Sequence, residues 1–386
     1  MEIRPLNEEQ RLLRDTIRRM AEERVRPRAA EIDATAEYPQ DMFDLLREMG
    51  LFALPFPKEY GGAASMVSAC LAVEELARVC YNTAYLLVVQ WSGFGAILAS
   101  GDDAQKARLL PGLVAGDLRA AIAVTEPGTG SDVAGIQTRA EKCDGGYALT
   151  GGKIYCTNAR HSDFIIVAAR SGGEAGHRGI GAFIVERGAV GFTIARDEVK
   201  MGARGIPSSE LRFDKAFVPV ENRLGPEDGG FKAIMAAFNR TRPVIGARGT
   251  GLALGAMELA ADYAKERMAF GQPVSDFQGV RWMLADMAMR IEAARGLVYR
   301  AASAVDRGVT GMELARLSAM AKCMATDAAM QVATDAVQIF GAAGVSKDVP
   351  IERYMRDAKV LQIVEGTNQI QRNIVADALL GRAARR

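Results

Sequence analysis

The sequence predicts an α+β protein of several domains, in which a helical region, a β-region and a second helical region follow one another. Two observations predict this order. Apolar residues recur at helical spacing before about residue 118 and again after residue 226, whereas short apolar runs separated by Gly, Asp and Ser clusters lie between them. The chain has 386 residues, which suits about two or three domains. We therefore expect domains over residues 1–118, 119–225 and 226–386.

The first region reads as a series of helices. Asn7 can cap a helix, and Gln10 stands three residues later, as in a capping box. Pro27 should kink or end this helix because proline lacks the backbone donor that a helix interior needs. Further helices are expected over residues 40–49 and within residues 64–114.

The middle region has the pattern of strands and turns. The runs AAIAVT, YALTGGKIYCT, FIIVAAR, GAFIVE and SELRF, between Arg119 and about Pro219, predict an antiparallel sheet or a small barrel. Long helices return after the Gly229–Gly230 pair. They are expected at residues 231–270, 277–307 and 311–340, with a last one after Glu365.

Composition excludes several classes of function. Lys and Arg together number 48 and Asp and Glu 47, so there is no global charge to attract nucleic acid or an anionic membrane. The five cysteines lack CxxC spacing and only two histidines accompany them, which predicts no metal, no disulfide framework and a reducing compartment. The sequence contains no run of 18 apolar residues, so we expect no membrane-spanning segment. The acidic start, with Glu2, Glu8 and Glu9, is unlike a signal or transit peptide, so we expect a cytoplasmic protein.

Glu365 is the first candidate for chemistry. It directly follows Leu361, Ile363 and Val364 in the segment LQIVEGTNQIQR, and a carboxylate beside apolar side chains gains proton affinity, as a general base near neutral pH requires. The alternative is that Glu365 merely opens a helix that begins at Gly366, where the helix dipole favours an anion. The residues alone leave both interpretations open.

The segment AVTEPGTGSDVAG is the second candidate. It joins a strand to a Gly-rich turn that can present backbone N–H groups and the hydroxyls of Thr125 and Ser131 to a planar polar ring edge or a phosphate. A plain turn is the alternative, because Pro, Gly, Ser and Asp are ordinary loop residues. The third glycine of a dinucleotide fingerprint is missing here, and the glycines around Gly249 lie in helical sequence, so a Rossmann or P-loop enzyme is not expected.

The chain resembles the acyl-CoA dehydrogenase family of flavoproteins over essentially its whole length. The matching segments, in the family's order, are AIAVTEPGTGSDVAG, IYCTNA, TRPVIGARGTG, ERMAFGQPVSDFQ, ADM, ATDAVQIFG and RYMRDAKVLQIVEGTNQIQR. The resemblance implies an N-terminal helical domain, a middle antiparallel β-barrel-like domain and a C-terminal four-helix bundle. It also implies FAD as cofactor, an acyl-CoA substrate, an electron-transferring flavoprotein as acceptor and a homotetramer built as a dimer of dimers.

The resemblance assigns roles to individual residues. Glu365 matches the base that removes the α-proton of the thioester while the β-hydrogen leaves as hydride to flavin N5, giving the trans-2-enoyl-CoA. Thr241 stands where some members carry the base instead, and it cannot accept the proton. The implied FAD contacts are Thr125, Ser131, Tyr155, Thr157, Arg267, Phe270, Gln278, Gln338, Gly341, Thr367 and Gln369. The implied substrate contacts are Ser131, Asn239, Arg242, Val364 and Gly366.

Some of these contacts are expected to cross between subunits. Arg267, Phe270 and Gln278 match residues that reach a neighbouring subunit's FAD, and Gln338 and Gly341 match the opposite side of that site. A monomer is therefore expected to bind FAD badly.

Several positions depart from the family pattern. Tyr155 replaces the usual tryptophan beside the flavin, and Asn239 replaces an acid that often meets the CoA arm. Val364 replaces the tyrosine of many straight-chain members, which makes branched or ring-bearing acyl groups plausible. Trp91 is expected either in the acyl cavity or in the core. For Arg242 the alternative to an active-site role is a salt bridge on the helix surface.

Arg248 is a further departure, because straight-chain relatives usually have a small residue at its position. It could meet a second carboxylate on the substrate. The alternative is that it extends to solvent or pairs locally, as arginines on long helices often do.

The expected activity is therefore FAD-dependent α,β-dehydrogenation of an acyl-CoA thioester. Two alternatives remain open: an acyl-CoA oxidase that passes electrons to oxygen, and a non-catalytic scaffold of the same fold.

Overall fold

Helices form the first region of the chain. The computed structural model describes residues 6–172, 176–227 and 229–381, so Glu2 lies outside it. Helix α1 (Glu8–Met20) begins at the expected capping box, in which Asn7 and Gln10 bond reciprocally. The break expected near Pro27 is confirmed: a π-helical turn (Ala21–Val25) and a 3-10 turn (Arg26–Arg28) separate α1 from the next helix. The further helices are α2 (Ala29–Thr35), α3 (Gln40–Glu48), α4 (Met66–Val79), α5 (Tyr81–Ser100) and α6 (Asp103–Ala115).

The middle region is a sheet that is antiparallel only in part. Its strands are β1 (Ala120–Ala123), β2 (Arg139–Cys143), β3 (Gly146–Thr157), β4 (Phe164–Arg170), β5 (Ile180–Glu186), β6 (Phe192–Asp197), β7 (Ser208–Pro219) and β8 (Arg223–Leu224). They follow the order β6-β7-β3-β2-β4-β5-β8, with β1 beside β4. The pairs β1–β4 and β2–β4 are parallel and the others antiparallel. The sheet is thus mixed, because β1 enters beside β4 directly from the helical region.

Long helices form the last region, as expected. They are α7 (Gly230–Glu266), α8 (Gln278–Asp306), α9 (Gly311–Phe340), α10 (Ile351–Leu361) and α11 (Asn368–Leu380). Two details differ from the prediction. Helix α7 ends at Glu266 because a hairpin of β9 (Met268–Ala269) and β10 (Gln272–Pro273) follows it, and α10 was not expected. The helix–sheet–helix order and the fold class are confirmed.

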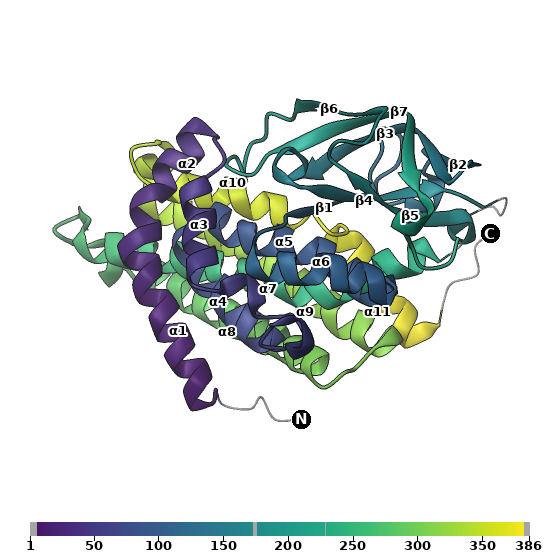
Figure 1. Cartoon of the computed structure of the whole chain (residues 1–386). Coiled ribbons are helices and arrows are strands. Elements are labelled where there is room, and N and C mark those ends of the chain that lie inside the picture. Colours follow the sequence, from purple (N-terminus) through teal and green to yellow (C-terminus); the bar gives the residue numbers. More distant parts are fainter. Residues whose placement is uncertain (1–5, 173–175, 228, 382–386) are drawn as a thin grey trace.

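Helix α7 joins the two helical regions into one body. It packs against α4 and α5 on one side and against α8 and α9 on the other. Helices α4 and α7 approach so closely that a Cβ atom on Gly251 would overlap the carbonyl oxygen of Glu74. The sheet lies over α5, with β1 packed on that helix (Figure 1). The cavity described below lies where these layers meet.

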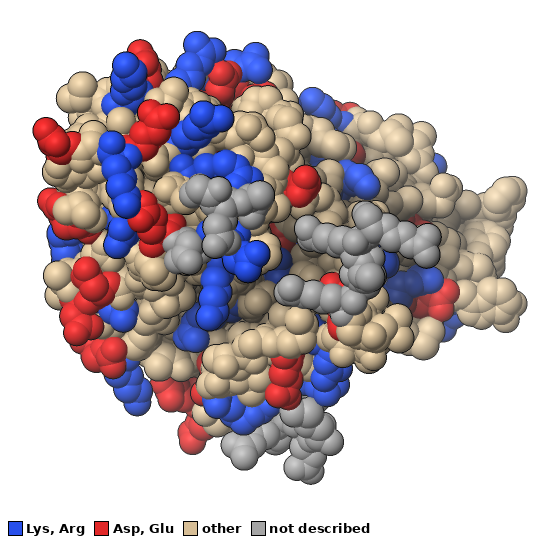
Figure 2. Space-filling model, turned by 90° about the vertical axis from the view of Figure 1, so that its right-hand side faces the viewer, with Lys and Arg blue, Asp and Glu red and all other residues tan. Residues whose placement is uncertain are grey.

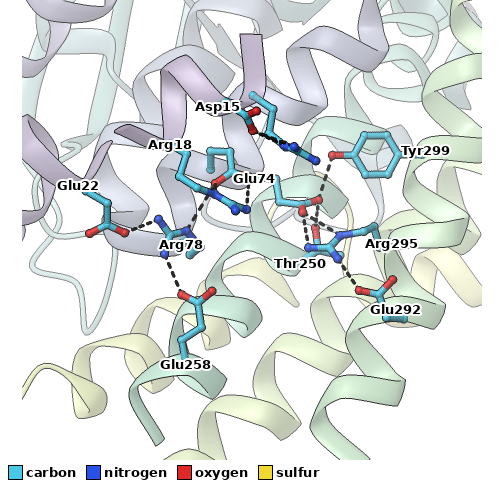
Figure 3. A network of polar contacts seen from close by, with 12 residues as sticks. Asp15, Arg18, Glu22, Glu74, Arg78, Thr250, Glu258, Glu292, Arg295 and Tyr299 are labelled. Atoms are coloured by element: carbon cyan, nitrogen blue, oxygen red, sulfur yellow. Dashed lines mark hydrogen bonds and ion pairs between the residues drawn. The ribbon is translucent and has the colours of Figure 1, made fainter. Parts of the chain in front are cut away.

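A network of partly buried ion pairs strengthens the contact between the helical regions (Figure 3). Glu74 of α4 accepts hydrogen bonds from Arg295 of α8 at 2.6 and 2.8 Å, from Thr250 at 3.0 Å and from Tyr299 at 3.1 Å. Arg78, one turn further along α4, donates to Glu258 at 2.8 Å. A buried carboxylate is tolerated when several donors surround it, so this network fixes how α4 sits on α7 and α8.

Helix α5 is a core helix. It has the length and apolar composition of a membrane-crossing helix, but 78% of its most apolar window is buried inside the protein. Its neighbours α4 and α7 cover it, so its apolar character is explained by the core.

Candidate active site

One large cavity brings together most of the predicted site residues. It has a volume of about 2470 Å³ and lies among α5, α7, the sheet and the turn between α10 and α11. Ten predicted residues line it: Thr125, Ser131, Tyr155, Thr157, Asn239, Arg242, Val364, Glu365, Gly366 and Thr367. The basic residues Lys232 and Arg240 line it as well. On the face drawn in Figure 2, Lys and Arg side chains gather beside a central hollow.

Glu365 occupies a tight turn between α10 and α11. Its backbone is left-handed, with φ of 53°, and Gly366 follows with φ of 91°. Helix α11 begins only at Asn368 and is capped by Thr367, so Glu365 does not open a helix and that alternative is wrong. A left-handed backbone is unfavourable for a residue with a Cβ atom, and hydrogen bonds hold it. Arg242 and Gln371 both donate to the carbonyl oxygen of Glu365, at 3.4 and 3.3 Å.

The carboxylate of Glu365 lies in a poorly hydrated corner of the cavity. Its Oε2 accepts a hydrogen bond from the Thr241 hydroxyl at 3.0 Å, and its Oε1 lies 3.5 Å from the Ser92 hydroxyl. Burial raises the pKa of Glu365, while the Thr241 hydroxyl and the nearby cations Arg242, Arg248 and Lys322 oppose that rise. The group therefore combines the enhanced basicity of a desolvated acid with donors that keep it oriented.

A buried lysine donates hydrogen bonds to the turn between α10 and α11. Lys322 of α9 is fully buried, and its Nζ donates to the carbonyl oxygen of Gly366 at 2.9 Å and to Oδ1 of Asn368 at 2.8 Å. Burial lowers the pKa of Lys322 to about 7, with the negative charge of Glu365 acting in the opposite direction. The sequence prediction missed Lys322; its one signal was a charged residue inside the apolar run LSAMAKCMA.

Arg242 is part of the cavity wall and not a surface residue. Its side chain is buried, and it donates to Oδ1 of Asn239 at 2.5 Å as well as to the Glu365 backbone. Burial lowers the pKa of Arg242 to about 10, and Glu365 raises it. The surface salt bridge considered for this residue is therefore wrong.

The Gly-rich turn is held by an ion pair that the sequence prediction did not include. Glu126 is buried and accepts hydrogen bonds from the backbone of Gln137 at 2.6 Å, from the backbone of Thr138 at 2.9 Å and from Nζ of Lys153 at 2.7 Å. Lys153 also donates to the carbonyl oxygen of Val124 at 3.0 Å, and burial lowers its pKa to about 8. A plain surface turn does not need a buried ion pair. The Glu126–Lys153 pair therefore indicates that this turn is held in one conformation.

Strand β3 presents two predicted residues to the same cavity. Tyr155 has a positive φ of 55° and lies at an irregularity in the β3–β7 pairing, which leaves its side chain 58% exposed. The hydroxyl of Thr157, two residues on, lies 3.4 Å from that of Ser208. An exposed aromatic ring and several hydroxyls on one wall suit a flat heterocycle.

Six predicted cofactor residues lie outside this cavity. They are Arg267, Phe270, Gln278, Gln338, Gly341 and Gln369, and all are exposed. Phe270 is 97% exposed at the tip of the β9–β10 hairpin, which projects at the left of Figure 1. Gln369 stands in the first turn of α11, directly after the turn around Glu365, whereas Arg267, Phe270 and Gln278 lie at and beside the hairpin, away from the cavity of their own chain.

The structure also shows the surroundings of Trp91 and Arg248. Trp91 is buried, donates from its ring nitrogen to the carbonyl oxygen of Phe52 at 2.9 Å and does not line the cavity, so it belongs to the core. Arg248 does not reach solvent, which rules out that part of the simpler interpretation, and within the described residues its guanidinium contacts aromatic rings but makes no hydrogen bond. Tyr85, Val89 and Ser92 of α5 line the cavity where Trp91 was considered.

Comparison with known proteins finds similarity over nearly the whole chain. The family models for acyl-CoA dehydrogenase match in all three parts: the N-terminal domain over residues 7–117, the middle domain over 121–216 and the C-terminal domain over 228–380. A probable acyl-CoA dehydrogenase of Mycobacterium leprae is 43% identical over 376 residues, which is 97% of this chain and 96% of the relative. The cyclohexane-1-carbonyl-CoA dehydrogenase of Geobacter metallireducens is 42% identical over 98% of this chain and 99% of its own.

A solved structure gives the same result. Butyryl-CoA dehydrogenase from Megasphaera elsdenii superposes with a TM-score of 0.94 at 39% identity, covering 98% of this chain and 100% of its own.

Proposed function

The chain belongs to the acyl-CoA dehydrogenase family of oxidoreductases, and we propose on that premise that it desaturates an acyl-CoA thioester between its α and β carbons. Glu365 is the base that removes the α-proton. The observation that carries this proposal is the placement of a desolvated carboxylate in the wall of the large cavity, where Thr241 donates to its Oε2 and Arg242 donates to the backbone carbonyl oxygen of the same residue. Thr241 can donate to that carboxylate but cannot replace it as a base.

FAD fits the same cavity beside Glu365. The wall of the cavity offers the hydroxyls of Thr125, Ser131 and Thr157 together with the ring of Tyr155, and the Glu126–Lys153 pair keeps their turn in place. FAD, when bound, supplies the acceptor for the β-hydrogen and its electron pair. A volume of about 2470 Å³ exceeds the ~300–1,000 Å³ of an ordinary ligand pocket, as a site for two large molecules requires.

The residues of this chain supply the remaining parts of the reaction. Glu365 takes a proton from the α-carbon, and the cation Arg242 in the cavity wall stabilises the negative charge that develops on the thioester. Asn239, Lys232 and Arg240 line the cavity and offer an amide and two positive charges to the pantetheine arm and phosphates of CoA. Ser131, Val364 and Gly366 border the acyl group.

We further propose that neighbouring subunits complete the FAD site. The exposed residues Arg267, Phe270 and Gln278 lie beside the projecting hairpin, away from the cavity of their own chain, and a guanidinium suits a pyrophosphate. A homotetramer would bring them to a second subunit's cofactor. An electron-transferring flavoprotein as acceptor follows from the family, and a cytoplasmic location stays a prediction.

Glu365→Gln tests the assignment of the base. The variant should bind FAD and acyl-CoA, because the amide has nearly the same shape, but an acyl-CoA should no longer bleach its flavin under anaerobic conditions. Thr241→Ser is the matched control, since it keeps a hydroxyl beside the carboxylate. Bleaching of the Glu365→Gln flavin at the wild-type rate would refute the proposal. Peroxide produced in proportion to turnover in air would instead identify oxygen as the acceptor.

A further inference from the structure

Arg248 is a buried cation that has no hydrogen-bonding partner among the residues the structure describes. It lies in the middle of α7 with 0% of its surface exposed, and its Nε, Nη1 and Nη2 atoms all lack a hydrogen bond. A guanidinium carries five N–H donors in one plane and stays protonated in proteins. Burying a charge is unfavourable unless other groups compensate it, so the surroundings of Arg248 indicate what it is there to bind.

Two tyrosines of α5 contact Arg248 on its faces only. The guanidinium carbon lies 3.8 Å from the ring centre of Tyr85 and 4.5 Å from that of Tyr81. Such cation–π contacts stabilise the faces of the guanidinium, but they leave its N–H groups, which point outward in the plane, without acceptors. The hydroxyl of Tyr81 is also buried without a partner. Donors therefore accumulate here without a matching acceptor.

This cluster lies at the end of the cavity wall formed by α5. Ser92, whose hydroxyl faces Glu365, Val89 and Tyr85 line the cavity on successive turns of the helix. Tyr85 stands seven positions before Ser92, which is ~10 Å along a helix. Arg248 does not line the cavity itself, because it lies behind the Tyr85 ring. An acyl chain that starts beside Glu365 and follows α5 in this direction ends at Tyr85.

The charges around Glu365 are also unbalanced, because the basic groups near it outnumber the acidic ones. Arg242, Arg248 and Lys322 all act on its carboxylate, and all three are buried. Asp327 also acts on Lys322, which leaves Glu365 as the carboxylate that faces two permanently charged arginines. A second carboxylate would balance the site, whereas an alkyl end would leave the donors of Arg248 unsatisfied.

We propose that Arg248 and the hydroxyls of Tyr81 and Tyr85 form a carboxylate subsite at the closed end of the acyl cavity, reached when the Tyr85 side chain turns aside. The preferred substrate is then the CoA thioester of a short dicarboxylic acid. This inference rests on the proposed function, because it requires the acyl group to lie between Glu365 and Tyr85. A guanidinium that receives a carboxylate through two parallel hydrogen bonds is a specific and strong pairing.

Equilibrium binding tests the subsite separately from catalysis. Titration calorimetry on the FAD-loaded Glu365→Gln protein compares glutaryl-CoA with pentanoyl-CoA, and adipyl-CoA with hexanoyl-CoA, so that each pair differs only in the terminal group. The dicarboxylic thioesters should bind about tenfold or more tightly, the effect of one hydrogen-bonded charge pair. Equal affinities, or tighter binding of the monocarboxylic thioesters, would overturn the proposal.

Substitution of Arg248 assigns any preference to this residue. In the Glu365→Gln background, Arg248→Met should abolish the dicarboxylic preference, and Arg248→Lys should keep part of it, since lysine retains the charge but not the planar fork. An unchanged preference in Arg248→Met would contradict the proposal. If Arg248→Met does not fold, the ratio of dicarboxylic to monocarboxylic affinities measured in the Glu365→Gln protein, with Arg248 in place, still decides. Failure of the proposed function has a different signature: no thioester of either kind bleaches the flavin of the unsubstituted enzyme.

Discussion

The hydroxyl of Thr241 lies 3.0 Å from Oε2 of Glu365 and connects the first third of α7 to the turn before α11. The two residues are far apart in the sequence, and their contact fixes the carboxylate relative to the cavity wall. The hydrogen bond favours the charged form of Glu365, whereas burial favours the neutral form. The balance between these two effects sets the pH at which the proposed base becomes active.

Thr241→Val should make the enzyme more sensitive to acid. The pKa of Glu365 is already raised by burial, and removal of the Thr241 hydroxyl raises it further. Because the base works only when deprotonated, the rate of flavin reduction falls as the pH drops through this pKa, and the falling limb should move to higher pH in the variant. At pH values below this pKa the rate should fall about tenfold at a given pH, since a hydrogen bond to a charged group contributes ~1.5 kcal/mol or more.

The pH profile of anaerobic flavin reduction checks this prediction. Thr241→Ser should keep the profile of the unsubstituted enzyme, because serine supplies the same donor. If Thr241→Val lowered the rate equally at every pH, the hydroxyl would not act through the ionisation of Glu365.

Lys153→Met should weaken FAD binding. The substitution leaves the buried carboxylate of Glu126 with two backbone donors and no counter-charge, so the turn that carries Thr125 and Ser131 should loosen. Breaking a buried ion pair in this way costs ~3–5 kcal/mol. The measurement is the FAD dissociation constant together with the thermal midpoint of the apoprotein.

The control for this prediction is Lys142→Met on the neighbouring strand β2. Lys142 is exposed and pairs with Glu227 at the surface, and exposed pairs contribute little. The double variant Glu126→Gln/Lys153→Met should recover part of the stability, since no charge is left buried alone. Full FAD affinity in Lys153→Met would show that the turn does not depend on the pair.

The sequence predicted those elements whose pattern is long and local. The spacing of apolar residues placed the long helices, and the runs AAIAVT and FIIVAAR placed β1 and β4. Helix α10 and strand β6 were not predicted from the sequence. Helix α10 is short and carries charges on its outer face, and β6 is only partly buried. The mixed character of the sheet depends on which strands become neighbours, which no single segment encodes.

The site was predictable to a similar extent. Glu365 could be singled out from the apolar residues before it and from the family resemblance. Lys322, Lys153 and Arg248 could not be assigned their surroundings, because a lysine or arginine in a helix or strand is usually exposed. Their burial arises from the packing of α9, β3 and α7 against other elements, which is a tertiary property.

Lys322 should make the stability of the protein rise with pH. Burial lowers its pKa in the folded state to about 7 from an ordinary value of 10.5, so the unfolded chain binds more protons between these two values. The stability that this group contributes is fully present above the higher pKa and is lost as the pH falls to the lower one. The slope is at most ~1.4 kcal/mol per pH unit in that window.

Thermal unfolding at pH 7, 8 and 9 measures this effect. The rise in the thermal midpoint should be smaller in Lys322→Met, which cannot be protonated. Lys265→Met is the matched control, because Lys265 is exposed on α7 beside Asp262. The same pH dependence in Lys322→Met and in the unsubstituted protein would mean that other groups cause it.

Gly251→Ala should destabilise the protein through the contact between α4 and α7. A Cβ atom at Gly251 would overlap the backbone carbonyl of Glu74, and backbone cannot move aside as a flexible side chain can. The helices must separate, which strains the ion pair of Glu74 with Arg295 and the hydrogen bond that Thr250 donates to Glu74. Overpacking of this kind costs ~1–3 kcal/mol, although alanine by itself is the better helix former.

Gly279→Ala separates these two opposing effects. Gly279 lies in the first turn of α8, and nothing lies within 4 Å of a Cβ atom placed there, so the substitution should be neutral or slightly stabilising. The comparison is the thermal midpoint of each variant, with FAD content as a measure of the distant cavity. Because the contact of α4 with α7 also positions α5 against the cavity, Gly251→Ala should lose FAD as well as stability. If Gly251→Ala were as stable as Gly279→Ala, α4 and α7 would be able to separate without loss of stability.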